Sequence, residues 1–219
     1  MIKYIIFDMD GVLINDMPRH VYAWKKALKG YGINPKNKEL YLIEGASSFQ
    51  FLQRILDKES IKLTKQTMKE IHEKKLQYFT DKGKTKPYKI LKFLQKLKSS
   101  GIKMAVATGD HQLPAYAEIN EFFPNIFDYI ITGDDIKNSK PNPEEYNLAI
   151  KKLKAKKSET LVIENAPFGI QAAKSAGVNK VYALTTTLKK KYLTDADCIF
   201  FNHKKLFKIL FKELRIIKW

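Results

Sequence analysis

The hydrophobic positions along the chain follow two different patterns. Between about residues 16 and 82 the apolar residues recur at the spacing of one helix face, with little sign of a strand. After this block, short apolar runs alternate with segments of helical periodicity up to residue 201, and one apolar run at residues 2–7 precedes the block. Strands that alternate with helices are typical of a parallel sheet with crossover helices.

This pattern predicts an α/β fold, a doubly wound (Rossmann-like) parallel sheet with an inserted helical cap domain. Because the first strand precedes the helical block and the second follows it, we expect a core domain at residues 1–14 and 84–219 and a cap domain at residues 15–83. A cap inserted there lies over the carboxyl ends of the strands, where open α/β sheets bind ligands. The expected strands are residues 2–7, 102–107, 127–131, 160–163, 180–184 and 198–201, and the expected core helices are residues 88–99, 113–121, 143–154 and 168–176.

Two carboxylates follow the first predicted strand directly. Asp8 and Asp10 are two residues apart, and Gly11 allows the backbone to turn sharply after them. A carboxylate is a competent nucleophile toward phosphorus, and a second carboxylate can move protons to and from the reacting oxygens. The alternative interpretation is an acidic turn between strand and loop, and this pattern alone does not decide between the two.

Later segments place polar residues near other predicted strand ends. Thr108 and Gly109 follow the second strand, where a hydroxyl and a freely approached backbone N–H suit an anion, although a helix cap or a turn explains them better in isolation. Lys140 stands just before a predicted helix, where an ammonium can hold a phosphate against the attacking carboxylate. Glu164 and Asn165 end the fourth strand, and their oxygens suit a hard cation such as Mg²⁺.

The net charge of +17 at pH 7 raises the question of nucleic acid. The basic residues are nearly all lysine, with arginines only at Arg19, Arg54 and Arg215, and the lysines are spread over almost every predicted helix. Proteins that read nucleic acid rely more on arginine forks and on basic residues interleaved with aromatic ones. We therefore interpret the lysines as solvated helix faces and expect no nucleic-acid partner, while a positive field still helps to collect small phosphorylated anions.

Composition and cysteine usage indicate a globular intracellular protein. The chain is 44% hydrophobic and 12% aromatic, which is not typical of disorder. No apolar stretch approaches the roughly 20 residues that span a bilayer, and the amino terminus lacks the pattern of a secretory signal. Cys198 is the only cysteine, so no internal disulfide forms. We expect a cytoplasmic protein without a membrane partner, and of the oligomeric states we favour a monomer.

The strand-end motifs, in this order, resemble the haloacid dehalogenase-like superfamily, in its helical-cap branch with β-phosphoglucomutase-like and phosphoglycolate phosphatase-like members. The segment Asp8-Met9-Asp10-Gly11-Val12 is similar to the first motif, and Thr108, Lys140 and Glu164-Asn165 are similar to the next three. The resemblance implies that Asp8 is the nucleophile and Asp10 the general acid/base. It also implies that Thr108 and Lys140 hold the transferring phosphoryl group. Mg²⁺ would be bound by Asp8, the backbone carbonyl of Asp10 and the Glu164-Asn165 pair, partly through water.

The fourth motif departs from the family pattern, which more commonly carries an aspartate where Asn165 stands. The amide oxygen of Asn165 can coordinate Mg²⁺, but it brings no charge. We expect Glu164 to take over this missing electrostatic role.

The predicted cap holds the clues to the substrate. His20, in the segment His20-Val21-Tyr22-Ala23-Trp24, resembles a histidine of β-phosphoglucomutase and its relatives, although a residue on a helix face explains it as well. We expect Gly45, Ala46 and Ser47, in a predicted cap loop, to face the substrate. A mutase calls for an arginine next to that serine to hold a second phosphate, and Ser48 stands there instead.

These features predict a Mg²⁺-dependent phosphatase that hydrolyses a small phosphorylated metabolite through an aspartyl-phosphate on Asp8. Asp10 favours the cleavage of phosphate esters over the cleavage of carbon–halogen bonds, because an alkoxide leaving group needs a proton. A β-phosphoglucomutase-like hexose-phosphate mutase is the first alternative. A catalytically inactive, basic nucleic-acid-binding protein is the weaker alternative, because every catalytic role in the motifs has an occupant.

Overall fold

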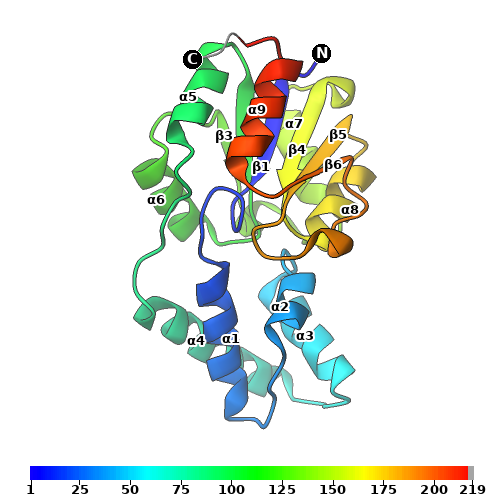
Figure 1. The fold of residues 1–219 in the computed structure, drawn as a ribbon. Coiled ribbons are helices and arrows are strands. Elements are labelled where there is room, and N and C mark those ends of the chain that lie inside the picture. The colour runs from blue at the N-terminus through cyan, green and yellow to red at the C-terminus, as the bar shows by residue number, and fades with distance from the viewer. Residues whose placement is uncertain (217–219) are drawn as a thin grey trace.

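A six-stranded parallel sheet forms the centre of the computed structural model, which describes residues 1–216 (Figure 1). The strand order is β3-β2-β1-β4-β5-β6, so the first strand lies in the middle with later strands on both sides. The strands are β1 (Tyr4–Asp8), β2 (Lys103–Ala107), β3 (Tyr129–Ile131), β4 (Thr160–Glu164), β5 (Lys180–Leu184) and β6 (Cys198–Phe200). The predicted α/β class with a doubly wound parallel sheet is therefore confirmed.

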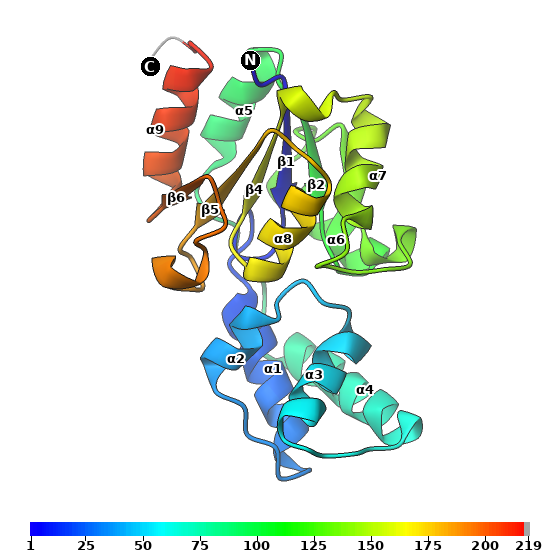
Figure 2. The same cartoon turned by 90° about the vertical axis from the view of Figure 1, so that its right-hand side faces the viewer.

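Helices cover both faces of the sheet (Figure 2). One face carries α5 (Leu91–Ser99), α6 (Gln112–Phe122) and α9 (His203–Glu213), and the other carries α7 (Glu144–Leu153) and α8 (Pro167–Ser175). Alternate strand residues supply the two cores, so Ile5 and Phe7 point to the first face and Ile6 to the second. Since the central strands are buried on both faces, their sequences are nearly continuous apolar runs.

Four further helices form a group beyond the carboxyl ends of the strands, at the opposite end of the molecule from the amino terminus (Figures 1 and 2). They are α1 (Met17–Lys29), α2 (Asn37–Leu42), α3 (Ser48–Lys58) and α4 (Lys65–Asp81). The group has a hydrophobic core of its own, in which Trp24 stacks on Phe51 with ring centroids 4.7 Å apart. We keep the domain boundaries at residues 14/15 and 83/84 as a proposal, and residues 217–219 of the expected core domain lie outside the described residues.

The two segments that join the helical group to the sheet run side by side. Ile14 pairs with Pro87 in an antiparallel bridge, and the N–H of Tyr88 donates to the carbonyl of Leu13 over 2.9 Å. This pairing holds the returning chain in an extended conformation. Therefore α5 begins at Leu91, three residues later than the helical periodicity predicts.

Helix α9 lies beyond the last element predicted from the sequence. Its inner face buries Leu206, Phe207, Leu210 and Phe211 against the sheet. Phe207 stacks on Phe93 of α5 with ring centroids 4.8 Å apart. The spacing of these four residues is that of a helix face, which is the sequence signal that identifies α9.

Candidate active site

The ends of three neighbouring strands bring the predicted motif residues together. Asp8 is the last residue of β1, Thr108 directly follows β2, and Glu164 is the last residue of β4, with Asn165 next to it. The parallel register places Asp8 opposite Ala107 of β2, and Phe7 opposite Ile163 of β4. All four polar side chains are buried. The sheet order thus explains why residues far apart in the sequence meet at one edge of the sheet.

Lys140 is the cation at the centre of this edge. Its Nζ donates to Asp8 Oδ1 over 2.5 Å and to Glu164 Oε1 over 3.0 Å, and it lies 3.2 Å from Glu145 Oε1 as an ion pair. Burial alone would lower the pKa of Lys140, but the charges of Asp8, Glu145 and Glu164 outweigh it and raise that pKa well above its ordinary value. Lys140 therefore stays protonated and can hold an anion beside Asp8.

Both oxygens of Glu164 are already occupied by hydrogen-bond donors. Oε1 accepts from Lys140 Nζ and from the hydroxyl of Tyr146 (2.7 Å), and Oε2 accepts from the backbone N–H groups of Asn165 (2.8 Å) and Ala166 (3.1 Å). Gly169 at the start of α8 faces this carboxylate so closely that a Cβ there would lie 1.7 Å from Oε1. These contacts position Lys140, and they occupy both oxygens of Glu164, which the sequence predicts to take part in a metal site together with Asn165, partly through water.

Asn165 meets a carboxylate that the sequence motifs do not identify. Its Nδ2 donates to Glu44 Oε1 over 2.7 Å and to Thr187 Oγ1 over 3.1 Å. This orientation leaves Asn165 Oδ1 and Glu44 Oε2 buried without a hydrogen-bond partner among residues 1–216. Glu44 belongs to the helical group, directly before the predicted substrate loop, so only its position next to Gly45 hints at a role in the site.

The loop of Gly45, Ala46 and Ser47 packs on the segment that carries Lys140. Gly45 has a φ of +90°, and a Cβ there would lie 2.8 Å from Lys140 Cδ, so this contact requires glycine. The N–H of Ser47 donates to Ser139 Oγ over 2.8 Å. Gly45 and Ala46 face the inner cavity described next, whereas Ser47 faces the outer crevice between helices and sheet.

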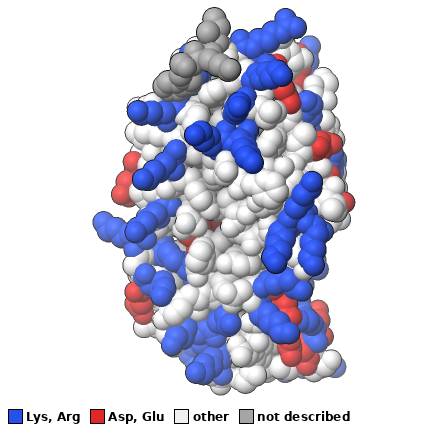
Figure 3. Space-filling view, viewed as in Figure 1, with Lys and Arg blue, Asp and Glu red and all other residues white. Residues whose placement is uncertain are grey.

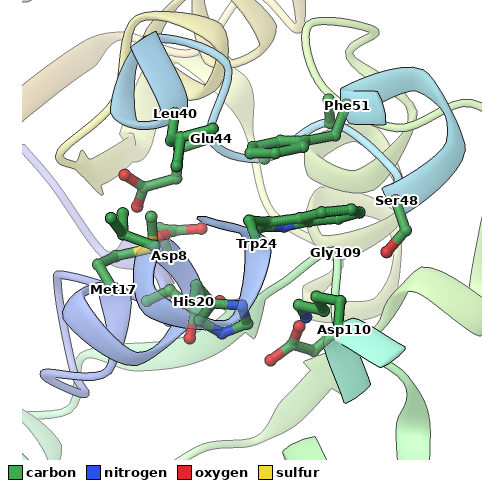
Figure 4. Close-up of a pocket in the computed structure, with 15 residues that line it drawn as sticks. Asp8, Met17, His20, Trp24, Leu40, Glu44, Ser48, Phe51, Gly109 and Asp110 are labelled. Carbon is green, nitrogen blue, oxygen red and sulfur yellow. The ribbon is translucent and has the colours of Figure 1, made fainter. Parts of the chain in front are cut away.

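A cavity of about 90 Å³ lies between the strand ends and the helical group (Figure 4). Figure 4 shows Trp24 and Phe51 stacked along it, with Glu44 reaching toward Asp8 and with His20 and Asp110 below Trp24 in this view. Lys75 of α4 also lines the cavity and is itself buried. Trp24 and Lys75 each fall on a predicted helix face. Residues of a buried core and residues that line a cavity recur with the same periodicity, so the sequence does not distinguish these two as cavity residues. The lining residues are Asp8, Asp10, Met17, His20, Val21, Trp24, Leu40, Glu44, Gly45, Ala46, Ser48, Phe51, Lys75, Gly109 and Asp110.

Asp10 lies at the cavity among other carboxylates. Burial raises its pKa well above the ordinary value, and the charges of Asp110, Asp16 and Asp8 raise it further. The raised pKa favours the protonated form of Asp10, at the position where the family resemblance places a general acid. Thr108 Oγ1 accepts the N–H of Asp110 over 3.2 Å, so the second motif also orders this side of the cavity.

Comparisons with known proteins agree with the observed fold. A sequence profile described as haloacid dehalogenase-like hydrolase matches residues 5–183. The chain is 32% identical over 199 residues to the phosphorylated carbohydrates phosphatase of Thermotoga maritima, covering 89% of this chain and 91% of that protein. It is 28% identical over 179 residues to the fructose-1-phosphate phosphatase of Escherichia coli, covering 81% and 94%. A solved structure from Bacteroides vulgatus, described as a candidate β-phosphoglucomutase, has a TM-score of 0.88 at 33% identity and covers 98% of this chain and 89% of that one.

The contact between Gly169 and Glu164 predicts that Gly169→Ala damages the site. The added methyl group must displace the Glu164 carboxylate, which costs about 1–3 kcal/mol of the free energy of unfolding, as overpacking in a core does. Urea denaturation measures this loss. Gly30→Ala is the matched control, because no atom lies within 4 Å of its added Cβ, and it should change stability by less than about 0.5 kcal/mol. Equal stabilities of the two variants would contradict the prediction.

The buried carboxylates predict a pH-dependent stability of the metal-free protein. Burial, and next the charge of Asp8, raise the pKa of Glu44 well above its ordinary value. The folded chain therefore holds a proton that the unfolded chain releases, and stability is lost as pH rises toward this raised pKa. Glu44→Gln carries no such proton. The difference between its melting temperature and that of the wild type should therefore shift progressively in favour of the variant between pH 5 and pH 8, in the presence of a chelator. A difference that stays constant over this range would rule the prediction out.

Proposed function

The chain belongs to the haloacid dehalogenase-like hydrolase family, and on this premise we propose that it is a Mg²⁺-dependent phosphatase of a small phosphorylated metabolite. The observation that carries the proposal is the Asp8 carboxylate, held 2.5 Å from the Lys140 ammonium at a strand end and covered by the helical group. Relatives named as phosphatases of phosphorylated carbohydrates and of fructose 1-phosphate support a sugar phosphate as the substrate class.

Asp8 is the proposed nucleophile and Asp10 the proposed acid and base. The carboxylate of Asp8 attacks phosphorus, the bond from phosphorus to the ester oxygen breaks, and Asp10 gives its proton to the departing alcohol. Asp10 then takes a proton from water, which attacks the aspartyl-phosphate and releases inorganic phosphate while Asp8 is regenerated. Thr108, the backbone at Gly109 and the ammonium of Lys140 bind the phosphoryl oxygens, and Glu164 keeps Lys140 in place.

The oxygen-rich side of the site fits Mg²⁺. Asn165 Oδ1 and Glu44 Oε2 are buried acceptors without a partner in the described part of the chain, and Asp8 lies beside them. We assign the metal to Asp8, the backbone carbonyl of Asp10 and Asn165, with Glu164 contributing at most through water. When the metal is bound, Glu44 would release its proton and supply the negative charge that the amide of Asn165 lacks. A hard cation of this kind neutralises the charge of the reacting phosphoryl group when it is bound.

This assignment predicts that Glu44→Gln weakens Mg²⁺ binding about tenfold or more, because the site loses its compensating charge. Isothermal titration calorimetry without substrate measures the affinity. Glu39→Gln is the matched control: it removes the same charge from the helical group, but at an exposed ion pair with Lys58, and it should leave the affinity unchanged. An unchanged affinity in Glu44→Gln would indicate that Glu164 supplies the compensating negative charge. Glu164→Gln is then the next variant to be titrated with Mg²⁺.

A hexose-phosphate mutase is the second candidate function. It is supported by the Bacteroides vulgatus structure and by His20, which lies in the cavity next to Asp16. Ser48 lines the cavity where a second phosphate would call for an arginine, so hydrolysis remains the preferred reaction.

Nucleic acid is not part of the proposal. The basic side chains are spread from one end of the visible face to the other instead of lining one groove (Figure 3).

No helix within residues 1–216 combines the length and the apolarity that are needed to cross a bilayer. The cytoplasmic location and the monomeric state stay predictions.

A screen of phosphorylated metabolites with Mg²⁺ tests the proposed function. We expect the wild type to release inorganic phosphate from at least one sugar phosphate. Asp8→Asn should be inactive, because the amide cannot form the acyl phosphate, and Asp10→Asn should lose about 10²–10⁴-fold, the usual contribution of general acid–base catalysis. Interconversion of hexose phosphates without phosphate release would select the mutase. Activity retained by Asp8→Asn would remove the nucleophile.

A further inference from the structure

A second group of potential metal ligands lies beside the proposed active site. Asp10, Asp16, His20 and Asp110 each offer one ligand atom, and these atoms all lie within 4.8 Å of one another. Asp10 follows β1 and Asp110 follows β2, whereas Asp16 directly precedes α1 and His20 lies in its first turn. The group thus connects the sheet edge to the first helix of the cap.

Two of these carboxylates are incompletely satisfied by the protein. Asp16 is completely buried; its Oδ2 lies 3.2 Å from Nε2 of His20, while its Oδ1 has no hydrogen-bond partner in the described chain. Asp10 Oδ1 is also buried without a partner in residues 1–216. A buried carboxylate oxygen without a donor is costly unless a cation or water satisfies it, so these oxygens indicate a missing positive group.

A buried lysine of the same cavity lies close to this group without forming an ion pair with it. Lys75 lines the same cavity, but its Nζ lies over the rings of Phe79 and Trp24, 5.0 and 5.8 Å from their centroids. None of the ion pairs within the described residues joins Lys75 to Asp10, Asp16 or Asp110.

We propose that Asp10, Asp16, His20 and Asp110 form a binding site for a transition-metal dication such as Zn²⁺ or Mn²⁺, separate from the Mg²⁺ site. One imidazole nitrogen with three carboxylate oxygens is a donor set that such ions accept, whereas Mg²⁺ prefers oxygen ligands throughout. Ligand atoms around a tetrahedral ion with bonds near 2.1 Å lie about 3.4 Å apart. The group is therefore within small side-chain rotations of that geometry.

Occupancy of this site has a defined effect on the molecule. An ion in this site binds the side-chain carboxylate of Asp10, whereas the proposed Mg²⁺ site uses only the backbone carbonyl of Asp10. The ion also ties α1 to the ends of β1 and β2, across the paired segments that join cap and sheet. A transition metal bound here thus withdraws the acid/base group and fixes the cap against the sheet.

Direct metal binding tests the proposal without an assay of activity. The wild type is saturated with Mg²⁺ and titrated with Co²⁺, whose visible absorption is much stronger in four- or five-coordinate sites than in octahedral ones; Zn²⁺ is then added in competition. We expect one equivalent of Co²⁺ with strong visible bands, displaced by Zn²⁺. His20→Gln and Asp110→Asn should each weaken Co²⁺ binding about tenfold or more. Asp110 lies in a partly exposed loop, which makes its variant the safer one for folding.

His111→Gln is the matched control. His111 pairs with Asp134 over 2.8 Å on the exposed surface next to Asp110, so it is the other histidine–aspartate pair of this region. Co²⁺ binding that survives in His111→Gln and fails in Asp110→Asn supports the proposal. Absence of Co²⁺ binding in the wild type, loss of binding in His111→Gln, or complete displacement of Co²⁺ by Mg²⁺ would each overturn it.

Discussion

The site depends on one buried ammonium that is shared by three buried carboxylates. Lys140 contacts Asp8, Glu145 and Glu164 in a region closed to water, where an uncompensated charge costs several kcal/mol. Its position before α7 is therefore fixed by electrostatics as much as by packing. The same arrangement leaves this edge of the sheet with more negative than positive groups, and this excess favours the binding of a cation beside Asp8.

The helical group takes part in this balance. Gly45 lies against the aliphatic part of Lys140, and Glu44 adds a carboxylate that Asn165 orients through its amide. A carboxylate near Asp8 is thus held on the part of the chain that also encloses the cavity. The enclosure of the cavity and part of its charge thus come from the same segment of the chain. A core without its cap would lack both the enclosure and part of the electrostatics.

The strand-end residues could be predicted from the sequence because parallel strands bring their carboxyl ends to one edge, whatever the side-chain details are. Asp8, Thr108 and Asn165 meet there as a consequence of strand order, whereas Lys140 reaches Asp8 from the segment before α7. Glu44 could not be predicted in the same way, because its contact with the core depends on how the cap is oriented, which periodicity does not encode. The occupied oxygens of Glu164 depend on Tyr146 and on two backbone N–H groups, none of which forms a local sequence motif.

The paired segments at Ile14 and Pro87 have a consequence for how such a protein can diversify. The inserted segment leaves the sheet domain and returns to it at adjacent points. In its connection to the sheet, the whole insert therefore resembles one long hairpin loop. A different insert with ends equally close together could be grafted there without disturbing the strand order or the group of side chains at the strand ends. Substrate range and reaction chemistry can therefore be inherited separately, each on its own segment of the chain.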